Sequence, residues 1–597
     1  MRSLSSTVQF SKNMLLQLCL CAGLLLVLPQ CTRTSCTNGT PKQCKEADFA
    51  PGSNLAGEGF DITKMERKGA FVLNMDDWER DGKTCTLCVN PYMENKKQKL
   101  PLSVKDWRAK QSCSSRVSSS LHKSSESLVT SSSSSVENNW KMGLEFQTMK
   151  RSASLMLAGT NSKLSDYSME KTKNDKFSFS SLSMSCEHYS YGVVSSPNIS
   201  KDFKAALKQL PPAYNAKSKE QFYRLIDNFG THYLSKVKLG GNVQSVTSIR
   251  QCLASLQGLS SEEVQTCLEV EASASLRVTI NTESRHCKKD IEKSESKSAF
   301  SDLFNDRFTE IKGGHTTEPD LLFSADKDPT AYKEWLNTVP QNPDIISYSL
   351  SPLHQLLPAN KKTWSNLRSA ITHYILEKGL MINCTERCRK DPSDKCVCQC
   401  NDPAVNQDCC PSRRGIAQVV ITVQRATGLY GDYSTATDGF VKIIYNQVER
   451  TNVIYNNNNP HWNMVLNMGP QDLSVANKVK FQVMDQDNGW DDDLLGECVQ
   501  FLKNGIKEDF CNLNHGRLYF KLEVKCAPSL RGDSCKEYQA TPMDTSLKKL
   551  YVSRHAHPIP KPMLLEMGVF VNRPLYFNQT IMRNTTLTAK KQRYELK

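Results

Sequence analysis

The sequence lacks the features that mark a hydrolytic enzyme, a nucleic-acid-binding protein or a helical membrane protein. It contains neither a Gly-x-Ser-x-Gly elbow nor a His-Glu-x-x-His motif, so neither a serine hydrolase nor a zinc protease is indicated. The net charge of +14 is spread along the chain without a compact Lys/Arg block carrying aromatic residues, which argues against nucleic acid as a partner. Beyond the N-terminal segment there is no apolar run of about eighteen residues, the length that a membrane-spanning helix needs.

The first 35 residues have the pattern of a secretory signal peptide. Two basic residues, Arg2 and Lys12, precede an apolar stretch from Met14 to Leu28 that Pro29 ends. An uncleaved membrane anchor is the alternative, although the stretch is short for a bilayer span. We therefore expect a soluble, secreted protein with N-glycosylation at its sequons, which are Asn38, Asn198, Asn383, Asn578 and Asn584.

The cysteine content agrees with an oxidising compartment. The chain has 23 cysteines, and removal of the signal peptide would leave an even number for pairing. Seven of them fall between residues 384 and 410, which predicts a small module held by disulfides; a four-cysteine zinc site is the alternative. At Cys85-Thr-Leu-Cys88 we expect structural disulfides rather than a redox motif, because no βαβ pattern surrounds it. Two local disulfides are also expected, Cys498–Cys511 and Cys526–Cys535.

Aspartates gather in two short segments of the C-terminal third. At a separation of ~5 Å and an effective dielectric of ~20, each pair of like charges costs roughly 3 kcal/mol. Calcium relieves such repulsion, because it accepts six to eight oxygen ligands in flexible geometry. A solvated acidic loop is the alternative, and an EF-hand is excluded because the sixth residue from Asp485 is Trp490 and the twelfth is Gly496. The aspartates of these segments include Asp432, Asp438, Asp485, Asp487, Asp491 and Asp493.

The aspartate spacing resembles that of the C2 family over roughly residues 415–526. The match consists of an Asp pair six residues apart, followed by an Asp-x-Asp-x5-Asp segment. In that family, two loops at one end of a β-sandwich share calcium, which implies that the first pair lies on the first loop and the other acids on the third. Aromatic residues lie among the acids, so we expect the calcium-filled loops to dock on phospholipid through Tyr430, Tyr433 and Trp490.

Two segments alternate between apolar and polar residues with the period of a strand. In residues 269–281 every even position is apolar and every odd position is polar or charged, which gives a strand one apolar and one polar face. Residues 140–147 alternate in the same way. An ordinary half-buried strand is the alternative to a membrane-crossing strand, which needs about 9–11 residues. The membrane-inserting candidates are Val270, Ala272, Ala274, Leu276, Val278 and Ile280.

A short block around residue 230 resembles the signature of the membrane-attack-complex/perforin (MACPF) family. The block is Phe229-Gly230-Thr231-His232-Tyr233, followed by the pair Gly240-Gly241. The resemblance covers about residues 36–537 and implies an α+β multidomain fold. Its parts would be a bent antiparallel sheet with two helical clusters, near 149–176 and 268–300, an EGF-like module and a C2 β-sandwich. The implied bounds are 1–35 for the signal peptide, 36–378 for MACPF, 379–412 for the EGF-like module, 413–527 for C2 and 528–597 for an extension that is removed by processing.

The resemblance implies a secreted, calcium-dependent, pore-forming cytolytic protein and no enzyme. Such a protein docks on a phospholipid membrane, assembles into a homo-oligomeric ring and converts its helical clusters into barrel strands, with Gly240 and Gly241 letting the sheet open. It further implies release from cytolytic granules of cytotoxic lymphocytes and passage of granule serine proteases through the pore. The alternative is a non-lytic adhesion or scaffolding protein of the same fold, for which Arg531-Gly-Asp533 is a weak integrin-type signal.

Overall fold

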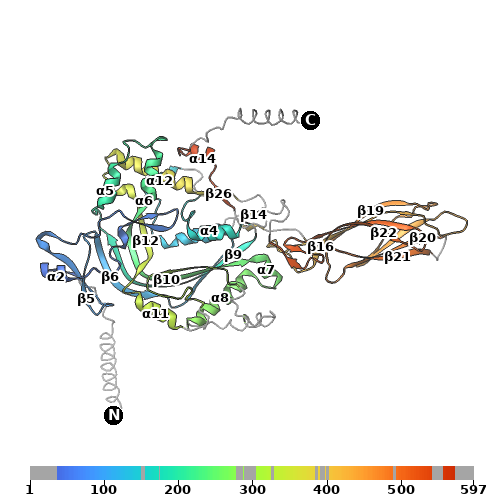
Figure 1. Ribbon diagram of the computed structural model, residues 1–597, viewed down its shortest axis with the longest axis horizontal. Helices are drawn as coiled ribbons and strands as arrows, with labels where there is room; N and C mark the ends of the chain where they lie inside the picture. The colour runs from blue at the N-terminus through green and yellow to red at the C-terminus, as the bar shows by residue number, and fades with distance from the viewer. Residues whose placement is uncertain are drawn as a thin grey trace, which may run out of the picture.

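The structure is a computed structural model, and it describes residues 36–148, 155–173, 175–276, 287, 304–323, 329–383, 388–389, 397–398, 403–487, 492–540 and 555–571. Figure 1 shows a body built around one large sheet, with helices at both ends of that sheet. An elongated β-sandwich, coloured orange, projects away from this body. None of the helices in these ranges is both long enough and apolar enough to cross a membrane.

The large sheet is organised by two long antiparallel strands, β9 (Phe177–Val193) and β10 (His232–Arg250). Both strands change their outer partner part-way along. In one half β10 pairs with β12 (Asp344–Pro352) and β9 with β6 (Val104–Cys113). In the other half β10 pairs with β11 (Arg307–Lys312) and β9 with β7 (Ser118–His122). Two further strands extend the same half: β2 (Glu58–Asp61) pairs with the start of β10 on the edge opposite β12, and β3 (Glu66–Phe71) pairs with β2.

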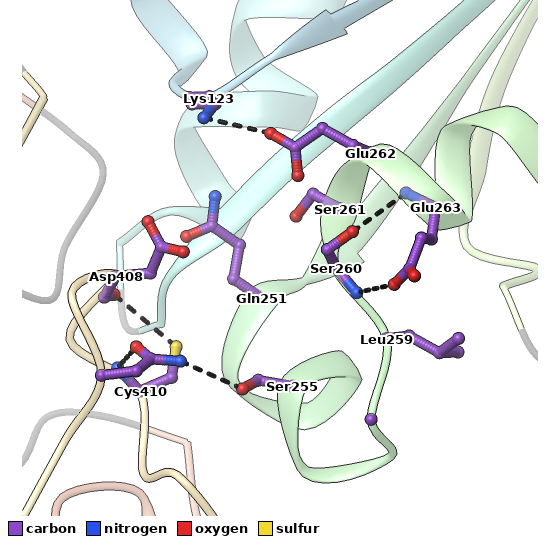
Figure 2. A pocket seen from close by; sticks show the side chains of 12 residues that line it. Lys123, Gln251, Ser255, Leu259, Ser260, Ser261, Glu262, Glu263, Asp408 and Cys410 are labelled. Atoms are coloured by element: carbon purple, nitrogen blue, oxygen red, sulfur yellow. Dashed lines mark hydrogen bonds and ion pairs between the residues drawn. The ribbon is translucent and has the colours of Figure 1, made fainter.

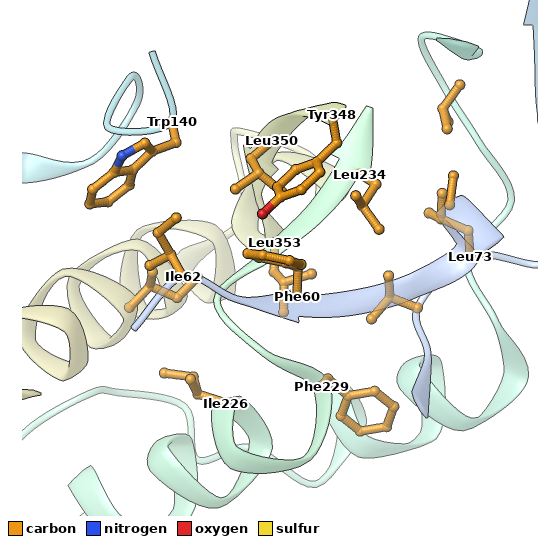
Figure 3. Close-up of a cluster of buried hydrophobic side chains, with 14 of the residues drawn as sticks. Phe60, Ile62, Leu73, Trp140, Ile226, Phe229, Leu234, Tyr348, Leu350 and Leu353 are labelled. Carbon is orange, nitrogen blue, oxygen red and sulfur yellow. The ribbon is translucent and has the colours of Figure 1, made fainter. Parts of the chain in front are cut away.

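Helices pack on the half of the sheet that contains the signature block. Figure 3 shows the core there, where Phe60 and Tyr348 of the sheet meet Ile226 and Phe229 of a helix. That helix is α6 (Lys219–Phe229). Its neighbours are α5 (Lys201–Lys208) and α12 (Lys362–Lys378). The 3-10 turn η6 (Leu353–Leu356) packs on α12, and the 3-10 turn η1 (Leu55–Gly57) packs on β10.

Two helical regions are inserted at the other end of the sheet. The first lies between β7 and β9 and contains α3 (Ser125–Ser132), η3 (Ser133–Ser135), η4 (Glu145–Thr148) and α4 (Lys163–Lys171). The second lies between β10 and β11 and contains α7 (Gln251–Leu256) and α8 (Ser261–Ser275). Helix α11 (Thr330–Thr338) packs beside the second region. Both regions follow strands that would otherwise continue, as the MACPF resemblance implies.

Neither alternating segment is a strand in the form described here. For residues 269–275 this agrees with the helical cluster that the MACPF resemblance implies near 268–300, whereas the strand expected for residues 140–147 is wrong. Residues 269–275 belong to α8, because a capping box between Ser260 and Glu263 starts a helix whose Val264, Leu268 and Ala272 are buried on one side. Figure 2 shows both hydrogen bonds of this capping box. Residues 140–147 form turns and the first part of η4, because Trp140, Leu144 and Phe146 are buried beneath α12 and the signature block while Met142 is exposed.

A small N-terminal unit and a partly described linker flank the body. Strands β1 (Cys36–Gly39), β4 (Cys85–Asn90) and β5 (Lys96–Lys99) form a sheet beside α2 (Pro41–Glu46) and η2 (Asp81–Lys83). Disulfides Cys36–Cys88 and Cys44–Cys85 confirm the structural role expected for Cys85 and Cys88. Most of the predicted EGF-like module lies outside the described residues, apart from β14 (Cys388–Arg389) paired with β15 (Val397–Cys398).

The projecting β-sandwich contains two four-stranded sheets. One has the order β19 (His461–Asp472), β16 (Ile416–Thr427), β23 (Arg517–Cys526) and β22 (Gly505–Asn512). The other has the order β18 (Gln447–Arg450), β17 (Gly439–Tyr445), β20 (Lys478–Asp485) and β21 (Asp493–Phe501). Disulfides Cys498–Cys511 and Cys526–Cys535 are both present, as predicted. Leu530 and Cys535, near β24 (Leu530–Arg531) and β25 (Glu537–Tyr538), are buried in the same core.

The C-terminal segment returns to the body. Strand β26 (Ala556–Pro558) pairs with β13 (Leu380–Ile382), which also pairs with β8 (Leu155–Met156). Helix α14 (Lys561–Glu566) then buries Met563 and Leu564 in the main core. The backbone N–H groups of His555 and Ala556 both donate to one carboxylate oxygen of Glu126 in α3, at 2.6 and 2.7 Å. Residues 555–571 are therefore part of the folded body.

Candidate calcium site and pore-forming sheet

Asp485 is the central acid of the predicted calcium site. It ends β20, its side chain is only 4 % exposed, and its Oδ1 accepts a hydrogen bond from the backbone N–H of Asp438 at 2.7 Å. Burial raises the pKa of Asp485, and the charges of Asp487, Asp432 and Asp438 raise it further, while the Asp438 N–H opposes this shift. The structure thus brings acids of the first and third loops together, because β17 and β20 pair Gly439 with Asp485.

An asparagine-rich segment braces the first loop, which sequence reasoning missed. The backbone N–H of Asn456 donates to Asp438 Oδ1 at 2.7 Å, and Asn458 Oδ1 accepts from the backbone N–H of Thr437 at 2.9 Å. Asn459 Oδ1 accepts from the backbone N–H of Gly428 at 3.0 Å. The signal for this role is the unusual Asn456–Asn459 run, since short amides that bond nearby backbone are favoured in loops.

Gly431 allows the first loop to approach Asp485. A Cβ added at this position would lie 1.7 Å from Asp485 Oδ2 and 2.7 Å from Asp485 Cγ. Any side chain larger than hydrogen would therefore push the loop away from the buried acid. The sequence contains this glycine in the acidic segment, but only the fold reveals what it touches.

The predicted acids occupy the end of the sandwich in different ways. Asp432 Oδ2 accepts a hydrogen bond from Thr435 Oγ1 at 3.2 Å, and Asp493 is exposed and opposite Asp485 in the β20–β21 ladder. Asp491 lies outside the described residues. Among those that are described, no three acidic, histidine or cysteine side chains are already arranged to hold a metal ion. The donor set nevertheless fits calcium in its chemistry, because it consists of carboxylates from two loops whose charges act on the buried Asp485.

Tyrosine side chains surround the acids and face solvent. Tyr433 is fully exposed and Tyr430 is 44 % exposed, with their ring centroids 6.3 Å apart. Trp490 lies outside the described residues. Tyr455, which precedes the bracing asparagines, is 65 % exposed and was missed by sequence reasoning. This end of the sandwich therefore presents aromatic side chains beside an acidic centre.

The signature block is a buried structural junction. Thr231 Oγ1 donates to the Phe60 carbonyl oxygen and accepts from the backbone N–H of Ile62, and it also lies 2.8 Å from His232 Nδ1. His232 Nε2 lies 3.0 Å from the carbonyl oxygen of Trp140. Burial lowers the pKa of His232 to about 3. The ring is therefore neutral at physiological pH, which suits a packing role rather than a catalytic one.

The glycines of the signature are required where backbones approach closely. Gly230 has φ +84°, and a Cβ there would lie 2.5 Å from the Phe60 carbonyl oxygen. Gly240 and Gly241 lie where β10 changes its partner from β12 to β11. A Cβ on Gly240 would lie 1.9 Å from the Cys186 carbonyl oxygen, and one on Gly241 would lie 2.6 Å from the Trp335 ring. The β9–β10 register shifts between Leu239 and Gly240, so this pair lies at a β-bulge in the bend of the sheet.

The membrane-inserting candidates are divided between described and undescribed residues. Ala272 and Leu276 are buried in the body, whereas Val270 and Ala274 are partly exposed on α8. Val278 and Ile280 lie outside the described residues. The sequon asparagines Asn38, Asn198 and Asn383 are exposed, and Asn578 and Asn584 lie outside the described residues.

Comparison with known proteins identifies the family. The family model of the MAC/Perforin domain matches residues 49–383, and that of the C2 domain matches residues 417–513. The chain belongs to the MAC/Perforin family. It is 37 % identical to Perforin-1 of Mus musculus over 528 residues, which cover 86 % of this chain and 95 % of that protein. It is 38 % identical to Perforin-1 of Homo sapiens over 515 residues, covering 84 % and 93 %.

More distant relatives include complement proteins. The chain is 24 % identical to complement component C6 of Bos taurus over 222 residues, which cover 35 % of this chain and 24 % of that protein. A solved C2 domain is 30 % identical with a TM-score of 0.16, covering 18 % of this chain and 98 % of that domain. The two family models and the Perforin-1 relatives confirm the predicted family and the α+β fold with a C2 sandwich.

Proposed function

We propose that this chain is a secreted pore-forming cytolytic protein that calcium directs to phospholipid membranes. The observation that carries the proposal is the buried Asp485, held among Asp432, Asp438 and Asp487 at the aromatic end of a C2 sandwich. The same chain contains the MAC/Perforin sheet with helical regions inserted at the ends of β9 and β10. Its relatives over most of the chain carry the name Perforin-1.

Charge explains why calcium would act as the trigger. Without a cation, the aspartates repel one another and also repel an anionic bilayer surface. Calcium held by Asp432, Asp438, Asp485, Asp487 and Asp493, with Asp491 assisting, would neutralise the site. Tyr430 and Tyr433, and Trp490 on the third loop, could then enter the interface, where amphipathic aromatic rings are favoured.

The bend of the sheet supports membrane insertion as the next step. The helical regions interrupt two pairs of strands, β7 with β9 and β10 with β11, whose ladders already run antiparallel. If these regions extend, the strands lengthen without new topology. The glycine pair at residues 240–241 lies where the sheet bends, so we propose it as the hinge of opening. The extended strands of neighbouring copies would close into a barrel, since an open sheet edge cannot lie in lipid.

We propose the remaining assignments on the sequence and the described contacts. Residues 1–35 form the signal peptide, the MACPF unit extends to about residue 383, and the C2 unit extends to about residue 540 because Leu530 and Cys535 lie in its core. The sequons carry glycans, and the three described asparagines are exposed. We further propose that the protein is stored in granules and that serine proteases pass through its pore. We also propose that it has no enzymatic activity, so no lipid hydrolysis products should accompany leakage.

The C-terminal extension acts in two parts in this proposal. Residues 555–571 stabilise the body, since Met563 and Leu564 lie in its core. Residues 572–597, which contain the sequons Asn578 and Asn584, form the removable part that hinders assembly. Truncation after Val571 should therefore leave folding intact and lower the protein concentration needed for rings. Unchanged assembly of the truncated chain would contradict this role.

Leakage from liposomes tests the central proposal. Phosphatidylcholine–phosphatidylserine vesicles loaded with a dye should leak when the protein and calcium are present, and should not leak when a chelator is added. Electron microscopy of the same vesicles should show rings only with calcium. Replacement of Asp485 by Asn should remove both binding and leakage, whereas replacement of Asp533, an exposed aspartate paired with Lys503 in the same unit, should remove neither. Strong leakage with chelator would refute calcium control.

A further inference from the structure

The ladder between β10 and β11 has a simple register. Asn242 pairs with Lys312, and the pairing continues one residue at a time to Thr247 with Arg307. The backbone N–H of Ser248 donates to the Asp306 carbonyl oxygen at 2.9 Å, which extends the same register by one step. In each pair the two residue numbers add to 554, and no bulge interrupts the ladder.

The residue numbers of the disulfide Cys267–Cys287 also add to 554, so these cysteines would pair directly if the ladder continued in the same register. Nineteen positions lead from Ser248 to Cys267, and nineteen lead from Cys287 to Asp306. In the structure described here Cys267 belongs to α8, and both cysteines are buried beside Leu268 and Ala272. In the packed helical form the disulfide needs only two neighbouring sulfur atoms. It does not require that the two arms, from Ser248 to Cys267 and from Cys287 to Asp306, have equal length. An antiparallel hairpin does require it.

We propose that Cys267–Cys287 is a cross-strand staple of the second membrane hairpin, and that Cys267 and Cys287 are positioning residues for pore formation. The inference rests on the proposed function. Directly opposed residues of antiparallel strands have Cα atoms about 4.5–5.5 Å apart, and disulfides need about 4.4–6.8 Å. The Cα atoms of the two cysteines are already 5.5 Å apart. The bond therefore persists while helix becomes strand, and it fixes the register of the two arms.

Any other register would break the staple. Diagonal neighbours across two strands lie about 7–8 Å apart, beyond the reach of a disulfide. A slip by one residue would exchange the two faces of each strand. The staple thus selects one pairing, and that pairing places the apolar positions 270, 272, 274 and 276 on the face opposite to the sulfur atoms. The disulfide then faces the aqueous lumen.

The staple also marks a depth in the membrane. The midpoint between the cysteines is position 277, ten positions from each. At ~3.3 Å per residue this gives ~33 Å, and a strand tilted by ~40° spans ~25 Å along the membrane normal. That distance equals the apolar band of a β-barrel, about 25 Å tall. The staple would lie at the near interface, and all six predicted inserting residues fall between the two cysteines and the tip.

The first hairpin independently supports the continued register. The β7–β9 ladder ends with His122 opposite Phe179, and the midpoint of the intervening chain lies between positions 150 and 151. The β9–β10 ladder pairs Phe177 with Arg250, and its continuation places position 150 beside position 277. The two hairpins would therefore end at the same level. Strands of equal reach are what a barrel wall of one height requires.

Relocating the staple tests the inference. In one variant, Cys267→Ser, Cys287→Ser, Glu271→Cys and Glu283→Cys place the bond at another in-register pair. In the matched variant, Cys267→Ser and Glu271→Cys let position 271, one helical turn along α8, pair with the retained Cys287, four positions out of register. Peptide mapping verifies each disulfide before and after vesicles are added. We expect the first variant to retain leakage within about twofold and the second to lose at least tenfold.

Four outcomes decide the matter. Equal leakage from the two oxidised variants would overturn the register assignment, and so would free thiols at positions 267 and 287 in pores of the unmodified chain. Recovery of leakage in the second variant after mild reduction would support it, because the out-of-register bond, and not the substitutions themselves, would then be what blocks insertion. If the unmodified chain never forms pores, the proposed function itself fails, and the staple fails with it.

Discussion

Replacement of Gly431 by alanine should separate calcium binding from the stability of the C2 sandwich. The added Cβ would lie 1.7 Å from Asp485 Oδ2, well below any normal contact distance. Asp485 cannot yield, because it is 4 % exposed and its other oxygen is held by the Asp438 N–H at 2.7 Å. The first loop must therefore move away by more than about 1 Å to restore a normal contact.

A loop shift of this size is large compared with the narrow range of calcium–oxygen distances. Calcium–oxygen distances fall between about 2.3 and 2.6 Å, so a displaced loop cannot contribute its carboxylate at full strength. We expect calcium affinity to fall about 100-fold, equivalent to about 2.7 kcal/mol. The thermal midpoint of the calcium-free protein should change little, since the loop lies at the surface and its neighbours in β17 and β20 are unaffected.

The matched control is Gly439→Ala on the other side of the same loop. A Cβ at Gly439 would have its nearest neighbour, Leu429 Cδ1, at 3.4 Å, an ordinary van der Waals distance. Calcium titration by calorimetry and vesicle sedimentation over a calcium series measure the effect. Equal affinities for Gly431→Ala and the unmodified chain would show that the first loop is not placed by its contact with Asp485, and the derivation of the site would be wrong.

Three further substitutions test the body of the molecule. Burial and Arg368 lower the pKa of His354 to about 4, so the unfolded chain binds more protons than the folded chain between about pH 6.5 and pH 4. The free energy of unfolding should therefore fall by ~1.4 kcal/mol for each pH unit as the pH is lowered through this range. His354→Phe should remove this part of the acid destabilisation in thermal melts, since neither ring nitrogen has a hydrogen-bond partner among the described residues. Glu126→Ala should lower the stability with which residues 555–571 are held on the body by ~2 kcal/mol and raise their rate of hydrogen exchange. Glu126→Gln retains the acceptor oxygen and should have a smaller effect. Gly240→Ala should lower stability by ~1–3 kcal/mol, measured by denaturant unfolding, because its Cβ would meet the Cys186 carbonyl oxygen; Gly192→Ala, with its nearest neighbour at 3.4 Å, should not.

Local chemistry made part of this molecule predictable. The Cys498–Cys511 and Cys526–Cys535 pairs follow from the short separations of these cysteines along the chain. The spacing of the aspartates identified the C2 sandwich, which the family comparison confirms. These features depend on residues close together in the chain or on a motif whose spacing is specific.

Contacts between distant segments were not predictable from the sequence. Nothing near Glu126 indicates that residues 555–556 return to it, and Gly431 looks like any loop glycine until Asp485 is placed beside it. Residues 140–147 were predicted as a strand because their apolar and polar side chains alternate. This alternation does not indicate whether a neighbouring strand is available to pair with them. Tertiary packing decided between the two local structures.

Helix α8 contains two periodicities in one sequence, and these account for both its helical form here and the proposed transition to a strand. Val264, Leu268 and Ala272 repeat at helical spacing and are buried together, which stabilises the helix against the sheet. The alternation from position 270 onward fits a strand equally well, and it leaves Val270 and Ala274 only partly buried on the helix. The helical form is thus held by packing on the body rather than by the sequence pattern alone. Opening of the sheet would remove that packing, and the strand pattern, already closed in register by Cys267–Cys287, would then determine the structure that forms.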